Sequence, residues 1–223
     1  MVWRSLEILW PTRCAGCDTE GHGQLCGACD TALQIRALAA LPGELAGGFA
    51  AAAYDGPLGI ALKRAKYGRD PALLSLLAAR FAQIVAPFAL GGVFDAVVPV
   101  PSPWTRVIAR GFSTGAVLSH HLCRTTGLPL RHALRLRPGR RNAGLDAIER
   151  RSNLEGRLWL RRAVPGRVLL IDDVFTTGST ARAAARQLLR GPTRSVWIAT
   201  LCVSETRGDD PSRGNPPLVR TRD

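Results

Sequence analysis

The sequence predicts an α/β protein, with a parallel β-sheet covered by helices on both faces and a small metal-binding segment near the N-terminus. Residues 168–171 are four consecutive apolar residues, which is typical of a strand buried on both faces. After a short turn, a stretch of strong helix formers follows over 181–189. Four cysteines between residues 14 and 29 form two Cys-x-x-Cys pairs, a spacing that predicts a zinc ribbon.

The turn between this strand and this helix is dense in polar groups. Asp172 and Asp173 are expected to end the strand, and a hydroxyl-rich turn follows, made of Thr176, Thr177, Gly178, Ser179 and Thr180. The start of a helix offers free N–H groups and the positive end of the helix dipole, so this turn suits a phosphate group. The two carboxylates suit sugar hydroxyls or a hydrated Mg²⁺. The alternative is an ordinary turn with a Ser or Thr cap, which needs far fewer polar residues.

The four cysteines are Cys14, Cys17, Cys26 and Cys29. Each Cys-x-x-Cys pair bends into a knuckle that directs two thiolates toward one point, and two knuckles complete a tetrahedral zinc site. Because four thiolates fill the coordination sphere, the metal is expected to be structural. A pair of redox-active dithiols is the alternative.

The composition points to an anionic partner. The 223 residues carry a net charge of +13 with a pI near 11, and Lys63 and Lys66 are the only lysines. Nucleic acid or a phosphorylated metabolite fits this charge, whereas a codon bias toward arginine explains the Arg:Lys ratio but not the excess of positive charge. No run of 18 apolar residues is present and the first ten residues make a poor signal peptide, so we expect a cytoplasmic protein without a membrane segment.

Strand and helix signals alternate along the rest of the chain. Strands are predicted over 49–54, 95–101, 130–136 and 194–203, and helices over 1–10, 57–66 and 71–88. A helix followed by a linker is predicted over 31–46, where a Pro-Gly pair at 42–43 breaks the pattern. Val100, Pro101 and Ser102 lead into a loop at the carboxyl edge of the sheet, and a further helix then runs to about residue 126. Arg106 and Arg110 lie at its beginning, where a guanidinium group suits a pyrophosphate.

A long basic loop is predicted over 137–157, and a polar, disordered tail over 206–223. A lid that closes over an anionic ligand explains the length and charge of the loop, and disorder without function is the alternative. We expect three parts: a helix, zinc ribbon and linker over 1–46, the α/β domain over 47–204, and the tail over 205–223.

Taken together, these features resemble the ComF (ComFC/GntX) family of phosphoribosyltransferase-like proteins, from about residue 7 to 204. The resemblance depends on the order and spacing of several motifs: the four cysteines, Lys63-Arg-x-Lys66-Tyr67, Val98-Pro-Val-Pro101, Arg110-Gly-Phe112, Gly144-Leu145, Glu149-Arg150, Asn153 and Asp172 to Thr180. Two positions depart from the family pattern: Ser113 replaces the usual Asn and Asn142 the usual Gln, so the details of lid closure are open.

The resemblance implies a type I phosphoribosyltransferase fold and binding of 5-phosphoribosyl-1-pyrophosphate (PRPP) with Mg²⁺. Asp172 and Asp173 are then expected to hold the ribose hydroxyls, residues 176–180 the 5-phosphate, and residues 100–104 the pyrophosphate. Arg110 is expected to stabilise the departing charge, and the lid to include Arg141, Asn142, Gly144 and Leu145.

Three functions follow as hypotheses. The first is transfer of a phosphoribosyl group with release of pyrophosphate. The second is a non-catalytic protein that handles single-stranded DNA in DNA uptake, together with a helicase-like partner that the family implies. The third is a regulator whose affinity for nucleic acid depends on PRPP. The acceptor and the oligomeric state are not determined by the sequence.

Overall fold

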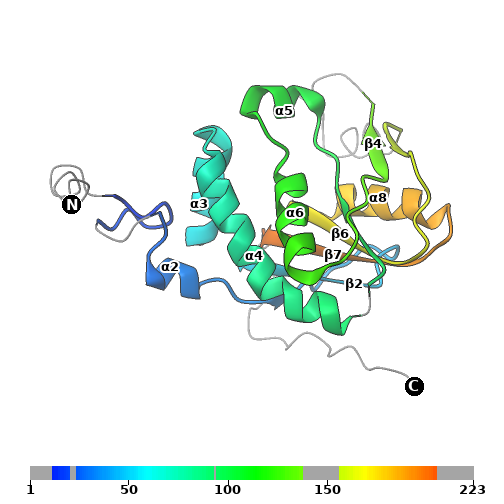
Figure 1. The fold of residues 1–223 in the computed structure, drawn as a ribbon, viewed down its shortest axis with the longest axis horizontal. Coiled ribbons are helices and arrows are strands. Elements are labelled where there is room, and N and C mark those ends of the chain that lie inside the picture. Colours follow the sequence, from blue (N-terminus) through cyan, green and yellow to red (C-terminus); the bar gives the residue numbers. More distant parts are fainter. Residues whose placement is uncertain (1–11, 21–23, 93, 138–155, 205–223) are drawn as a thin grey trace.

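The computed structural model describes residues 12–20, 24–92, 94–137 and 156–204 (Figure 1). Its centre is a five-stranded sheet in the order β1-β2-β7-β6-β3. The strands β2 (Gly47–Ala53), β7 (Thr193–Val203), β6 (Gly166–Phe175) and β3 (Ala96–Pro99) run parallel, and the short β1 (Arg36–Ala37) pairs antiparallel with β2 at one edge. The predicted mixed α/β fold with a parallel sheet is confirmed.

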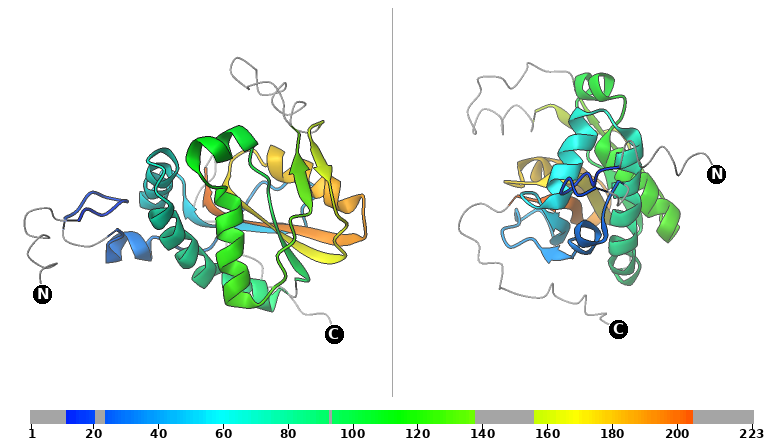
Figure 2. Two further views of the ribbon diagram at one scale, coloured as in Figure 1. Left: turned by 45° about the horizontal axis from the view of Figure 1, so that its top comes forward. Right: turned by 90° about the vertical axis from the view of Figure 1, so that its left-hand side faces the viewer.

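Alternate residues of β6 face two separate hydrophobic clusters. Leu169 and Ile171 lie in one cluster with apolar residues of α3 (Pro57–Tyr67), α4 (Pro71–Gly91) and α6 (Thr114–Thr126). Val168 and Leu170 lie in the other with residues of α8 (Ser179–Leu189). A strand covered on both sides has no polar face, which is the physical reason for its unbroken apolar run. Figures 1 and 2 show these helices packed around the sheet.

Three smaller elements complete the described part of the fold. A short helix, α2 (Gly27–Thr31), follows the first cysteines, and α5 (Trp104–Arg110) lies between β3 and α6. A separate antiparallel hairpin consists of β4 (Leu134–Leu136) and β5 (Leu158–Leu160). Asp70 caps α4 as expected, because its Oδ1 accepts a hydrogen bond of 2.9 Å from the N–H of Leu73.

The helix predicted in the first part of 31–46, before a linker, is wrong, because residues 32–46 contain no helix. After α2 the chain runs alongside β2, where Gln34 N–H donates to the carbonyl of Ala51 and Leu38 N–H to that of Gly48. Pairing with the sheet edge therefore prevails over the helix propensity of an Ala- and Leu-rich stretch.

Three further boundaries differ from the sequence-based expectation. The helix expected to reach residue 126 is divided into α5 and α6 at Gly111, whose positive φ of 85° ends α5. The strand expected over 130–136 is reduced to the three residues of β4, with an isolated bridge from Leu130 to Val97. Residues 158–160 form a strand, β5, for which the sequence analysis made no prediction.

Among the described residues, α4 alone is long and apolar enough to match a membrane span. The helix is not an unbroken apolar run, because Ser75, Arg80 and Gln83 interrupt it. Half of the matching window is buried inside the protein, where residues such as Leu77 and Phe81 belong to the main hydrophobic cluster. The expectations for residues 1–10, for most of the basic loop (138–155) and for the tail (206–223) lie outside the described residues.

Candidate PRPP-type site and four-cysteine site

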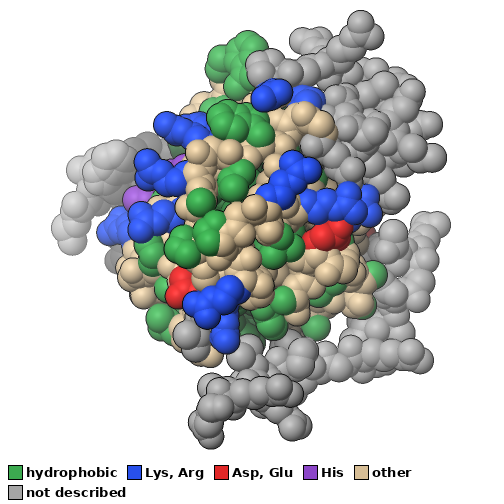
Figure 3. All heavy atoms as spheres, turned by 90° about the vertical axis from the view of Figure 1, so that its right-hand side faces the viewer, with side chains coloured by type: hydrophobic (Ala, Val, Ile, Leu, Met, Phe, Trp, Pro, Cys, Tyr) green, Lys and Arg blue, Asp and Glu red, His purple; other side chains and the backbone are tan. Residues whose placement is uncertain are grey.

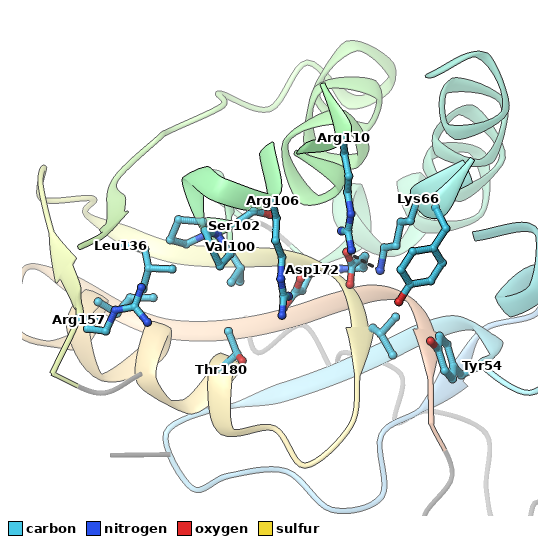
Figure 4. Close-up of a pocket in the computed structure, with 16 residues that line it drawn as sticks. Tyr54, Lys66, Val100, Ser102, Arg106, Arg110, Leu136, Arg157, Asp172 and Thr180 are labelled. Atoms are coloured by element: carbon cyan, nitrogen blue, oxygen red, sulfur yellow. Dashed lines mark hydrogen bonds and ion pairs between the residues drawn. The ribbon is translucent and has the colours of Figure 1, made fainter. Parts of the chain in front are cut away.

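A cavity with a volume of about 530 Å³ opens at the carboxyl ends of β3 and β6 (Figure 4). In open α/β sheets this edge is the usual place for ligands. The cavity is lined mainly by polar and charged side chains from seven elements or the loops beside them: Tyr54, Lys66, Tyr67, Ser102, Arg106, Arg110, Arg157, Asp172, Asp173 and Thr180. The structure thus brings together residues that are distant in the sequence.

Asp172 and Asp173 lie on the floor of this cavity. They do not end the strand as expected, because β6 continues to Phe175 and stays paired with β7 as far as Val203. The backbone N–H of Asp173 donates to Oδ1 of Asp172 at 2.8 Å, which fixes the first carboxylate. Both residues are half-buried.

The two carboxylates differ in their electrostatic surroundings. Burial and then the neighbouring charge of Asp173 raise the pKa of Asp172 to about 8. Asp173 instead forms an ion pair with Lys66, whose Nζ lies 2.8 Å from Oδ2, and both side chains are largely shielded from solvent. The pocket therefore holds one carboxyl group with a raised pKa and one that forms an ion pair with a lysine.

The turn after β6 forms a cradle at the start of α8. Gly178 has a φ of +70°, and a Cβ added there would lie 2.8 Å from Phe175 and 2.9 Å from Pro42, so only glycine fits the turn without strain. Oγ1 of Thr177 and Oγ of Ser179 form a hydrogen bond of 2.8 Å. Within the described part of the chain, no side chain caps the first N–H groups of α8, and a small cavity of about 30 Å³ lies among residues 174–181. These free donors suit a phosphate group.

The opposite wall is formed by the loop after β3 and by α5. Val100, Pro101 and Ser102 line the cavity, and Ser102 Oγ lies 3.2 Å from Ser113 Oγ at the start of α6. In Figure 4, Arg106 and Arg110 extend from α5 toward Asp172, while Lys66 enters beside them from another helix. Three cations therefore face the two carboxylates across the cavity.

The four predicted lid residues, Arg141, Asn142, Gly144 and Leu145, lie outside the described residues. The hairpin that leads into and out of this segment is described, and its Leu136, Arg157 and Leu158 line the cavity. The sequence analysis missed β5, although the apolar Leu158 and Leu160 on either side of Trp159 give the alternating pattern of a half-buried strand.

The sequence analysis also did not place Tyr54, Lys66 and Tyr67 in the site. The sequence analysis used the basic cluster Lys63-Arg-x-Lys66-Tyr67 only as one motif of the family resemblance. In the structure Lys66 reaches Asp173, and the Tyr67 ring lies 5.7 Å from the Arg110 guanidinium carbon. A lysine and an aromatic residue at the end of a helix were the available signal, but the sequence does not reveal the direction in which they point.

The four cysteines of the N-terminal segment form a second site. All four sulfur atoms lie within 4.8 Å of one another. A zinc ion with Zn–S bonds of about 2.3 Å requires sulfur atoms about 3.8 Å apart, so the set fits after a small contraction. Cys14, Cys26 and Cys29 are buried, and the N–H groups of Gly16 and Cys26 donate to Cys14 Sγ at 3.4 and 3.2 Å.

Burial opposes ionisation of Cys14, but these backbone donors prevail and lower its pKa to about 6. A thiolate held by N–H donors is the form that binds a metal ion. The arrangement therefore suits a metal such as zinc in a closed, structural site.

Comparison with known proteins identifies relatives by sequence. No family model matches the chain. It is 33% identical over 147 residues to competence protein F of Haemophilus influenzae, and the aligned region covers 60% of this chain and 63% of that protein. It is 30% identical over 155 residues to the DNA utilization protein YhgH of Salmonella typhi, and that aligned region covers 67% of this chain and 68% of the relative.

Solved structures give a weaker similarity. The orotate phosphoribosyltransferase from Aeropyrum pernix matches with a TM-score of 0.39 and 22% identity over 66% of each chain. A hypoxanthine phosphoribosyltransferase from Staphylococcus aureus matches with a TM-score of 0.40 and 14% identity, over 65% of this chain and 71% of that one. Because these scores are low, the assignment rests on the sequence relatives, and the resemblance drawn from the motifs is confirmed: the chain belongs to the ComF family of phosphoribosyltransferase-like proteins.

Proposed function

We propose that this protein binds PRPP with Mg²⁺ and transfers its phosphoribosyl group to a nucleophile, releasing pyrophosphate. The observation that carries the proposal is a cavity lined by two adjacent carboxylates and three cations, with a phosphate-type cradle in a small cavity beside it that shares Asp172 and Thr180. Each of these groups matches one part of PRPP, namely its 5-phosphate, its ribose hydroxyls and its pyrophosphate.

The roles follow from the positions of the groups. Residues 176–180 bind the 5-phosphate at the start of α8, and Asp172 and Asp173 accept hydrogen bonds from the two ribose hydroxyls. Residues 100–102, with Arg106 and Arg110, face the pyrophosphate. Mg²⁺ binds oxygen ligands, so it suits these carboxylates and the ligand's own oxygens, and it neutralises negative charge there.

In the transfer step the bond from C1 of the ribose to the pyrophosphate oxygen breaks, and its electron pair leaves with pyrophosphate. A new bond forms between C1 and the acceptor atom, which loses its proton to solvent. Arg106 and Arg110 stabilise the charge that develops on the departing group, because fixed cations in a partly enclosed site act without reorganisation.

The first test is calorimetric titration of the metal-loaded protein with PRPP and Mg²⁺. Asp173→Asn is expected to abolish binding while one zinc per chain is retained, and Asp55→Asn, at an exposed carboxyl outside the cavity lining, is the matched control. Release of pyrophosphate with a panel of acceptors then tests transfer. Wild-type affinity in Asp173→Asn would contradict the assignment of the site.

Handling of single-stranded DNA is the second candidate, and one surface favours it. In the β4–β5 hairpin, Arg135 and Trp159 are a cross-strand pair, both are exposed, and Arg137 and Arg161 are exposed nearby. Figure 3 shows a face of the molecule on which Lys and Arg side chains clearly outnumber acidic ones. An exposed aromatic ring among cations suits the stacking of bases and the binding of their phosphates.

For this candidate, Trp159→Ala is expected to weaken the binding of an oligonucleotide about 5- to 100-fold. Leu90→Ala, at an exposed apolar position on α4, provides the control. A steep dependence on salt is expected as well. If PRPP changes the affinity for the oligonucleotide, reciprocity requires the oligonucleotide to change the affinity for PRPP, which tests the third hypothesis, that of a PRPP-dependent regulator. A helicase-like partner remains part of this proposal.

The proposal places the protein in the cytoplasm, where thiols stay reduced and the four cysteines stay available to a metal. The division into parts at 46/47 and 204/205 also stays a prediction. Limited proteolysis with and without a chelator tests that division, because only the N-terminal part is expected to become sensitive when the metal is removed.

A further inference from the structure

The four-cysteine segment and the cavity are connected by one helix, α3. Figures 1 and 2 show the N-terminal segment beside this helix, at the side of the sheet. Arg64 of α3 donates from Nη1 to the backbone carbonyl of Cys14 at 3.3 Å, and its Nη2 lies 2.5 Å from Oδ2 of Asp18. Both partners belong to the first cysteine knuckle, so a single side chain of α3 holds that knuckle at two points.

The same helix carries Lys66 into the cavity. Lys66 lies two positions after Arg64, and residues two apart on a helix point in different directions. Its Nζ lies 2.8 Å from Oδ2 of Asp173. One short stretch of helix therefore faces the cysteine segment with one side and the candidate PRPP site with another.

The contact between the knuckle and α3 is tightly packed. Gly16 lies against the first residue of the helix, because a Cβ added there would be 3.0 Å from Cβ of Pro57 and 2.9 Å from Sγ of Cys29. Ala15 also belongs to the hydrophobic cluster that contains Leu58 and Leu62 of α3. A displacement of the knuckle would therefore be transmitted to the helix.

A second contact of the cysteine segment does not lead to the cavity. Asp30, next to Cys29, lies 3.0 Å from Nε of Arg80 on α4, and Arg80 does not line the cavity. The two arginines thus attach the same segment to two different helices, and only Arg64 lies on the helix that carries Lys66.

We propose that Arg64 is a positioning residue that couples the metal-loaded four-cysteine segment to Lys66, so that loading of the metal raises the affinity of the cavity for PRPP. The metal fixes Cys14, the carbonyl of Cys14 and the carboxylate of Asp18 fix Arg64, and Arg64 fixes the end of α3 from which Lys66 extends. The proposal rests on the proposed function for its ligand, but the coupling between the metal segment and α3 is independent of that ligand.

The expected effect is moderate, because the Arg64–Asp18 pair is partly exposed. Arg64→Ala is expected to weaken binding of Mg²⁺-PRPP about three- to tenfold with an unchanged zinc content. Arg80→Ala, the matched control, is expected to leave the affinity unchanged. Because Arg64 acts through Lys66, Lys66→Ala combined with Arg64→Ala is expected to bind no more weakly than Lys66→Ala alone.

Asp18→Asn is a second variant that preserves the backbone. Asp18 has a φ of +65°, a conformation that asparagine also adopts readily. This variant removes only the charge of the ion pair and is expected to reproduce part of the effect of Arg64→Ala. Two results would overturn the proposal. One is that the losses of PRPP affinity in Arg64→Ala and Lys66→Ala add when the two substitutions are combined. The other is that Arg64→Ala and Asp18→Asn both bind PRPP with wild-type affinity.

Hydrogen exchange of the full chain tests the coupling without PRPP. Removal of the metal by a chelator is expected to speed exchange of the α3 amides at residues 62–67 at least tenfold in the wild type. In Arg64→Ala these amides are expected to exchange faster already with the metal bound, and to respond little to the chelator. If α3 is unaffected by the chelator, the coupling fails. If α3 responds but PRPP does not bind, the proposed function fails while the coupling stands.

Discussion

Replacing Asp172 by Asn is expected to stabilise the protein and to abolish ligand binding. The pKa of Asp172 is raised from 3.8 to about 8, first by burial and then by the charge of Asp173. Between these two values the folded protein keeps a proton that the unfolded chain has lost, so a rise in pH favours the unfolded chain. The penalty begins near pH 4 and is complete above about pH 8, and an asparagine does not incur it.

The size of the effect follows from this interval. One pH unit corresponds to about 1.4 kcal/mol, so the interval between 3.8 and pH 7 sets an upper limit of roughly 4 kcal/mol. Because Asp172 is only half-buried and water can approach it, we expect a gain of about 1–2 kcal/mol in the free energy of unfolding at pH 7. The amide oxygen of Asn can still accept the hydrogen bond from the N–H of Asp173.

Urea denaturation of wild type and Asp172→Asn at pH 4.5 and pH 7.5 measures this gain. The midpoint is expected to rise by about 0.3–1 M at pH 7.5 and by much less at pH 4.5, with unchanged slopes. Asp55→Asn, at an exposed carboxyl, is expected to change neither midpoint. An equal rise at both pH values, or no rise at pH 7.5, would refute the electrostatic argument.

Further predictions concern the cation, the turn and the metal. Lys66→Ala is expected to weaken Mg²⁺-PRPP binding about 10- to 100-fold in calorimetry, because it removes a largely shielded cation beside Asp173. Lys63→Ala, on the same helix but placed over the Tyr54 ring at 4.3 Å, is its control. Gly178→Ala is expected to lower the free energy of unfolding by about 1–3 kcal/mol, because the positive φ and the close neighbours of this residue disfavour a Cβ. Gly43→Ala is the control and is expected to leave the free energy of unfolding nearly unchanged, because a Cβ there would meet nothing within 4 Å. Cys29→Ser is expected to reduce bound zinc, measured by elemental analysis, from one per chain to near zero, while Cys123→Ser, outside the cluster, retains it.

Local patterns were sufficient for several parts of the protein. The apolar run before Asp172 predicted a strand buried on both faces, and the dense turn after it predicted the helix start at α8. The two Cys-x-x-Cys pairs predicted a cluster of four sulfur atoms. In each case the residues that define the feature are neighbours in the sequence, so burial, capping and ligand geometry are visible in a short window.

Other parts depended on contacts that a short window does not contain. Residues 31–46 have the composition of a helix, but the available edge of β2 provides partners for their backbone, and the chain pairs there instead. The break between α5 and α6 at Gly111 directs Arg106 and Arg110 into the cavity, whereas the sequence predicted one continuous helix.

The sequence by itself determined the adjacent carboxylates, the hydroxyl-rich turn and the four-cysteine cluster, because each is a local pattern of side chains and backbone. Only the tertiary structure decided which cation meets Asp173. Lys66 belongs to a helix far from β6 in the sequence, and that helix is placed by its packing against the sheet and by the contact of Arg64 with the cysteine segment. The partner of a buried charge is set by such packing, since the geometry of a distant helix is not encoded in its own residues alone.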